Sequence, residues 1–124
     1  MIIVTLEEIE QYRAELAENP AALKALNMLE DCEGDLEDAA ISLALQVGQE
    51  PSQSEQWLNG LAKRWRPFVC QAGIKDALKA GSIVNVVNLL AAETDLPNLL
   101  ALPVVLYAVK TGVDEFCKPL QEKL

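Results

Sequence analysis

Apolar residues recur every three or four positions along almost the whole chain, and this spacing most limits how the chain can fold. A repeat of about 3.6 residues places apolar side chains on one face of a helix, whereas a strand requires alternation at every second residue. Prolines and glycines separate the periodic stretches, as expected where helices begin and end. The sequence therefore predicts an all-α fold, a compact bundle of seven to eight short helices.

The first 48 residues predict three helices, over 6–17, 20–32 and 35–47. Thr5 and Glu8 have the spacing of a capping box at the start of the first helix. Pro20 suits the first position of the second helix, and Gly34 suits the left-handed residue beyond its end. Apolar residues then repeat with the pattern of one buried helical face, which predicts the third helix.

Residues 54–124 predict further helices with a higher apolar content. The stretch 83–90 is apolar on nearly every side, so we expect it to form the most buried helix. Pro103 is expected to start a helix that runs to residue 110, and Pro119 is expected to limit the last helix.

Charge divides the chain into two halves. Residues 1–56 carry 13 acidic and 2 basic side chains, net −11, while residues 57–124 are net +2, which gives −9 overall. The polar stretch 48–54 is the one plausible linker. We expect residues 1–48 to form an acidic three-helix module and residues 54–124 an apolar helical half, packed together as one unit. This layout is typical of a binding face joined to a core or dimer half, and a single bundle with one acidic end is the alternative.

The run 22–45 resembles the second and third helices of the ubiquitin-associated fold and of its bacterial relative, the N-terminal domain of elongation factor Ts. The closest part is 33–40, EGDLEDAA, in which a Gly-Asp turn precedes a helix whose Ala and Leu positions pack on the helix before it. The resemblance covers about residues 5–47 and implies a three-helix binding module. Where that family has a Met-Gly-Phe-like or Thr-Gly loop, this chain has Glu-Asn-Pro at 18–20, so the partner of the family does not carry over.

The chain contains no histidine, which excludes a Ser-His-Asp triad, a Cys-His pair and an H-E-x-x-H zinc helix. Glycine-rich phosphate-binding motifs do not occur either. Acidic residues cluster over 30–38, but they lack the spacing of a calcium-binding loop and are explained by helix capping and solvation. We therefore expect no catalytic residue, no metal and no cofactor, and a chain that is not an enzyme.

Cys32, Cys70 and Cys117 lie far apart, without C-x-x-C spacing. An odd and sparse set of cysteines is typical of reduced thiols in a cytosolic protein, so we expect all three to be reduced and at least two to be mostly buried. The longest apolar stretch, 96–109, is shorter than the ~20 residues that cross a bilayer as a helix. The N-terminus has no basic region of a signal peptide. These features predict a soluble, cytoplasmic protein without membrane contact.

Two surfaces are candidates for function. The stretch 83–109 is so apolar that one small domain would leave part of it exposed, and pairing of two copies would cover it. The residues expected at this dimer face are Val86, Leu90, Leu102 and Leu106. Separately, Lys63, Arg64 and Arg66 alternate with aromatic residues as on single-strand nucleic-acid surfaces, although cations here also complement a helix C-terminus.

The sequence favours a non-enzymatic helical protein–protein interaction module, an adaptor or regulator that self-associates. The alternative is a nucleic-acid or anion binder that uses Lys63, Arg64 and Arg66, although three bases on a chain of net charge −9 make a weak positive footprint. A salt titration separates the two, because nucleic-acid affinity falls steeply with salt and apolar association does not.

Overall fold

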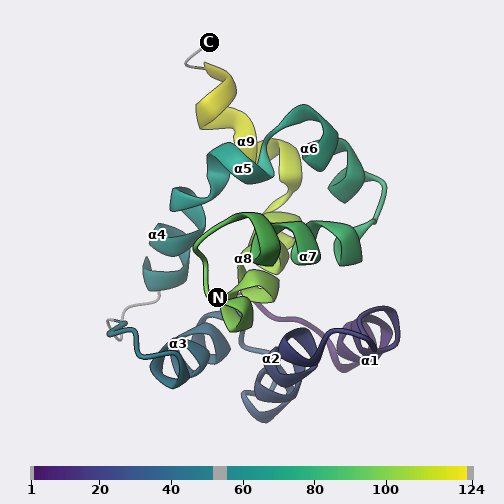
Figure 1. Cartoon of the computed structure of the whole chain (residues 1–124), viewed down its shortest axis with the longest axis vertical. Coiled ribbons are helices and arrows are strands. Elements are labelled where there is room, and N and C mark those ends of the chain that lie inside the picture. The colour runs from purple at the N-terminus through teal and green to yellow at the C-terminus, as the bar shows by residue number, and fades with distance from the viewer. Residues whose placement is uncertain (1, 52–55, 123–124) are drawn as a thin grey trace.

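The computed structural model describes residues 2–51 and 56–122, which form helices joined by short turns (Figure 1). The described helices are α1 (Leu6–Glu15), α2 (Pro20–Asp31), α3 (Leu36–Gln46), α4 (Gln56–Arg64), α5 (Arg66–Val69), α6 (Ala72–Lys79), α7 (Ile83–Glu93), α8 (Asn98–Thr111) and α9 (Val113–Glu122). The all-α prediction is confirmed. The described ranges hold nine helices rather than seven or eight, because Pro67 has no N–H to continue the α4 ladder and α5 starts as a separate turn.

Polar side chains start the helices of the N-terminal third, as the sequence predicts. The Thr5 hydroxyl accepts a hydrogen bond from the Glu8 N–H at 3.1 Å, and the Glu8 carboxylate accepts one from the Thr5 N–H at 3.0 Å. The capping box is therefore confirmed. Asp35 caps α3 by accepting from the Asp38 N–H at 3.2 Å. These caps fix the bounds of α1 to α3 within one or two residues of the predicted ranges.

Helix α8 lies at the centre of the molecule and packs against α2, α3, α4, α7 and α9 (Figure 1). Its buried side chains join residues of both halves of the chain in one hydrophobic core. The prediction that 83–90 forms the most buried helix is wrong, because α7 is covered by α8 on one face and leaves Asn85, Asn88 and Leu89 exposed on the other. None of the helices within the described ranges has the length and hydropathy that a membrane crossing requires.

Two prolines lie inside helices, although the sequence predicts that each marks the end or the start of a helix. Helix α8 begins five residues before Pro103 and continues past it, and α9 continues past Pro119. An internal proline removes one hydrogen bond and costs about 3 kcal/mol or more. In α8 the burial of apolar side chains against five other helices outweighs this cost, so tertiary packing overrides the local preference.

The predicted dimer face does not exist on the surface of the chain. Val86, Leu90, Leu102 and Leu106 are all buried within one copy. The prediction of an interface through these residues is wrong, because the helices around α8 are enough to enclose it. Among the described residues, the large apolar side chains that stay exposed are Ile3, Leu6, Leu45 and Leu89.

Candidate functional site

The N-terminal segment crosses the turn between α2 and α3 in an extended conformation. The Val4 N–H donates to the Gly34 carbonyl at 2.8 Å, and the Leu36 N–H donates to the Ile2 carbonyl at 3.0 Å. Ile3 and Asp35 thereby form an isolated antiparallel bridge. These bonds tie residues 2–4 to a turn that lies about 30 residues further along the chain.

Gly34 makes this close crossing geometrically feasible. Its φ is +85°, a left-handed conformation that glycine adopts without steric cost, as the sequence predicts for the residue beyond α2. A Cβ atom at this position would lie 2.3 Å from the Val4 carbonyl oxygen. The crossing therefore depends on the absence of a side chain at residue 34.

A groove opens beside this crossing, and we call it the N-terminal groove. Its lining residues are Ile3, Val4, Thr5, Leu6, Ile9, Glu30, Glu33 and Gly34, and its volume is about 310 Å³. Val4 and Ile9 are buried at its base. Ile3 is 44% exposed and Leu6 is 61% exposed, so the groove presents two apolar side chains to solvent.

Acidic side chains form the rim of the N-terminal groove. Glu30 contacts Arg13 of α1 at 3.0 Å, and Arg13 also pairs with Glu10. The Glu33 carboxylate has no hydrogen-bond or ion-pair partner among the residues that the structure describes. The rim therefore keeps an uncompensated negative charge next to the apolar floor.

Glu8 anchors the start of α1 to the central helix. Lys110 of α8 donates to both carboxylate oxygens of Glu8, at 2.9 and 3.0 Å. Partial burial acts to raise the pKa of Glu8, but the hydrogen bonds from Lys110 and Thr5 outweigh burial and lower it. The carboxylate is thus ionised at neutral pH and holds the floor of the N-terminal groove on the body of the fold.

The structure separates the three cations that the sequence groups together. Arg64 lines a pocket of about 640 Å³ with Trp57 and Gly60. Lys63 and Arg66 line a different pocket, which has a volume of about 170 Å³ and shares no lining residue with the first. Arg66 is half-buried, and its guanidinium carbon lies 5.0 Å from the centre of the Phe116 ring. The three side chains therefore do not line one common pocket, and their contact with nucleic acid or another anion stays a prediction.

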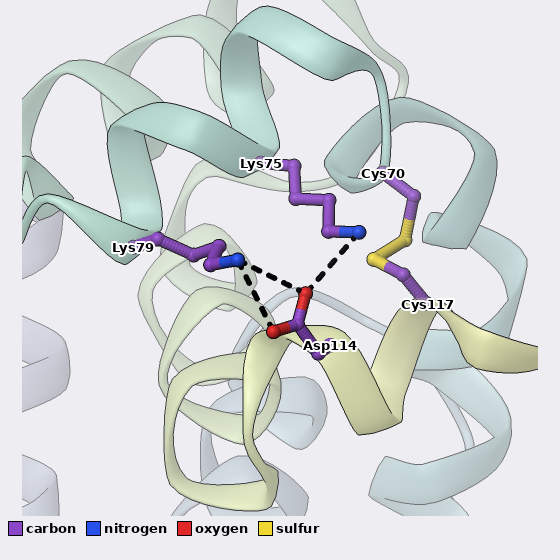
Figure 2. The surroundings of a disulfide bond; sticks show 5 residues. All are labelled: Cys70, Lys75, Lys79, Asp114 and Cys117. Carbon is purple, nitrogen blue, oxygen red and sulfur yellow. Dashed lines mark hydrogen bonds and ion pairs between the residues drawn. A yellow bond between two sulfur atoms is a disulfide. The ribbon is translucent and has the colours of Figure 1, made fainter.

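Cys70 and Cys117 form a disulfide bond, with 5.6 Å between their Cα atoms (Figure 2). The prediction that all three cysteines are reduced is therefore wrong, and the compartment no longer follows from the cysteine pattern. The two residues are 47 positions apart, and only the packing of α9 on α5 brings them together. Cysteine spacing carries no signal for such a pair.

An ion-pair cluster next to the disulfide also fixes α9. Asp114 contacts Lys75 at 3.2 Å and Lys79 at 3.1 Å, both from α6 (Figure 2). Hydrogen bonds from Lys79 and Lys75 lower the pKa of Asp114. Together with the disulfide, this cluster joins α9 to α5 and α6.

The remaining cysteine, Cys32, has a free thiol at the end of α2. Burial and the neighbouring Asp38 carboxylate raise the pKa of this thiol, which disfavours the nucleophilic thiolate. Across the described ranges, no three His, Cys, Asp or Glu side chains are grouped so that they could hold a metal ion.

The chain matches no protein-family model, and neither the curated proteins nor the solved structures include a significantly similar one. The resemblance to the ubiquitin-associated fold stays a prediction.

Proposed function

We propose that this chain is a non-enzymatic helical protein–protein interaction module whose N-terminal groove binds a partner segment with basic and apolar side chains. The observation that carries the proposal is the exposure of Ile3 and Leu6 in a groove with an acidic rim. Exposed apolar side chains gathered in one concave place are typical of recognition surfaces.

Charge identifies the kind of partner. Glu33 has no counter-cation among the described residues, and the first 56 residues carry a net charge of −11. A basic segment is attracted to this surface and oriented on it, whereas nucleic-acid phosphates and a second copy of the same acidic surface are repelled. The occupant is therefore a basic segment of another protein.

The size of the groove limits the occupant to a short segment. A volume of about 310 Å³ lies at the lower end of the range of roughly 300–1,000 Å³ that ligand pockets have. Such a groove holds one or a few side chains. A short segment that inserts leucine-like side chains between Ile3 and Leu6, with lysine or arginine beside them, fits both its floor and its rim.

The experiment that tests the proposal is an amide NMR titration of the whole chain with a synthetic helical peptide of leucine and lysine. A peptide of the same leucine pattern with glutamate in place of lysine is the control. We expect saturable shifts at residues 3–9 and 30–34 with the lysine peptide alone. Shifts spread over the whole acidic surface, or shifts centred on other residues, would contradict the proposal.

A matched pair of charge variants separates the groove from the general acidity of the chain. Glu33→Lys and Glu18→Lys change the net charge equally, but Glu18 lines a different pocket, with Asn19 and Asn88. We expect Glu33→Lys to weaken the lysine peptide about tenfold and Glu18→Lys about twofold, because only Glu33 lies on the rim. Equal effects of the two variants would count against the groove.

A further inference from the structure

Arg66 is a partly buried cation that contacts no carboxylate in the part of the chain that the structure describes. Three other cationic side chains of the described ranges are only 16–25% exposed, and each has an ion pair: Arg13 with Glu30, Lys75 with Asp114 and Lys110 with Glu8. Among the described residues Arg66 has no hydrogen-bond or ion-pair partner, and its Nε atom is buried there without an acceptor. The chain has 19 acidic and 10 basic residues, so this lack of a partner does not come from a shortage of acids. Partial burial of an unpaired cation is unfavourable, and an external anion would relieve that cost.

Arg66 lines a small pocket between the α4–α5 turn and α9, and we call it the α5–α9 pocket. Lys63 is the second cation of its lining, and Pro67, Pro119 and Leu120 supply apolar walls. The Phe116 ring lies against the Arg66 guanidinium and limits the directions in which it can donate. The pocket is thus an open hollow that combines two cations, neither of them in an ion pair among the described residues, with neighbouring apolar side chains.

We propose that the α5–α9 pocket binds an organic carboxylate with a small apolar body. A guanidinium matches the two oxygens of a carboxylate through parallel N–H donors, and the Lys63 ammonium adds a second positive charge. The pocket is an open hollow of about 170 Å³, which leaves room for one aromatic ring beside the two cations. An anion of benzoate size fits, and the proline and leucine walls favour it over a fully hydrated anion such as phosphate.

The disulfide determines the shape of this pocket. Cys70 follows α5, which carries Pro67, and Cys117 precedes Pro119 in α9, so the bond holds opposite walls of the α5–α9 pocket at a fixed separation. The contacts of Asp114 with Lys75 and Lys79 hold the same helix on α6 (Figure 2). The carboxylate site is therefore complete only when α9 is held in place.

The test is a titration of the oxidised chain with benzoate, followed by amide NMR, with benzamide as the uncharged control. We expect saturable shifts at residues 63–68 and 116–120 with benzoate, and none with benzamide. Binding of benzamide as strong as that of benzoate, or equal binding of inorganic phosphate, would overturn the proposal, as would the absence of saturable shifts.

Four variants of the three cations assign the binding to side chains. We expect Arg66→Gln to weaken benzoate at least about tenfold and Lys63→Gln about threefold, whereas Arg64→Gln, in the other pocket, changes it less than about twofold. Circular dichroism checks that Arg66→Gln folds. Arg66→Lys keeps the positive charge but loses the parallel N–H donors of the guanidinium, so we expect its affinity for benzoate to lie between those of the native chain and Arg66→Gln. Equal losses in Arg64→Gln and Arg66→Gln would contradict the assignment.

Two further arms distinguish the source of the carboxylate and the role of the disulfide. The first arm uses a short peptide that ends in leucine, and its C-terminal amide is the control for the carboxylate. Tighter binding of the free-acid peptide than of benzoate indicates that the natural ligand is a peptide C-terminus. Weaker binding than that of benzoate indicates a free small carboxylate. Reduction of the disulfide should weaken benzoate by at least about threefold, because one wall is released. Unchanged affinity after reduction would overturn the inferred dependence on α9.

Discussion

Gly34 is the residue on which the N-terminal groove most depends. Its left-handed backbone and the 2.3 Å approach of the Val4 carbonyl to its missing Cβ are two separate constraints. Gly48 shares the first, with φ +80°, but has no atom within 4 Å of an added Cβ. Comparing alanine substitutions at the two glycines therefore separates the cost of backbone strain from the cost of steric collision.

We expect Gly34→Ala to destabilise the chain clearly more than Gly48→Ala. The left-handed conformation costs roughly 1 kcal/mol for alanine at either position, and at residue 34 the collision with Val4 adds about 1–3 kcal/mol by forcing the crossing apart. Urea unfolding followed by circular dichroism measures both free energies of unfolding. Equal losses would show that the crossing of residues 2–4 over the turn contributes little.

Among the elements, α1 is connected to the centre of the fold by the pair of Glu8 and Lys110. Glu8→Gln keeps a side chain that can complete the capping box and removes the charge that pairs with Lys110. Glu7→Gln, one residue earlier in the same exposed first turn, is the matched control for loss of a negative charge near the helix N-terminus.

The stability difference between the native chain and Glu8→Gln should depend on pH. Because the pKa of Glu8 in the folded chain is lowered from 4.5, the ion pair contributes stability that is fully present above that value and is lost as the pH falls through the folded pKa. We expect about 0.5–1 kcal/mol at neutral pH. Urea unfolding at neutral and acid pH measures the difference, and a difference that persists in acid would contradict the role of the charge.

Sequence reasoning predicted the elements of the N-terminal third well because their determinants are local. The Thr5–Glu8 capping box and the Gly34 turn each lie within a few residues of the helix end that they define. The helix ends predicted at Pro103 and Pro119 are wrong, because packing that involves distant residues overcomes the local preference of proline. The disulfide escaped prediction for the same reason.

The N-terminal groove is not among the surfaces that the sequence predicts. Leu6 lies at the start of the predicted first helix, and its sequence context does not show that it stays 61% exposed in the described part of the chain. The groove forms where residues 2–4 pair with residues 34–36, and no local sequence pattern predicts this pairing. The predicted dimer face is expected to be exposed but is buried. The number of helices that pack around α8 cannot be predicted from the apolar content of 83–109 alone.

For the whole molecule, the disulfide should be a major source of stability. It closes a loop of 47 residues, and a bond of this kind typically contributes about 2–4 kcal/mol by restricting the unfolded chain. Cys117→Ser is expected to lose that amount in urea unfolding, and Cys32→Ser, which leaves the bond intact, is expected to lose less than about 1 kcal/mol.

A count of free thiols checks the same bond without any substitution. In denaturant and without reductant, one thiol per chain should react, that of Cys32. Reaction of all three thiols would show that Cys70 and Cys117 are not bonded.

The proposed function requires that a basic, apolar segment binds in the N-terminal groove. Leu6 and Leu45 provide the most direct test, because they are 61% and 58% exposed and only Leu6 lines the groove. Calorimetric titration of the Leu6→Ala and Leu45→Ala chains with the leucine–lysine peptide compares them under identical conditions. We predict that Leu6→Ala weakens binding about tenfold, or about 1.4 kcal/mol, and that Leu45→Ala leaves it within about twofold of the native chain. Equal affinity of the two variants, or a larger loss in Leu45→Ala, would contradict binding of the peptide in the N-terminal groove.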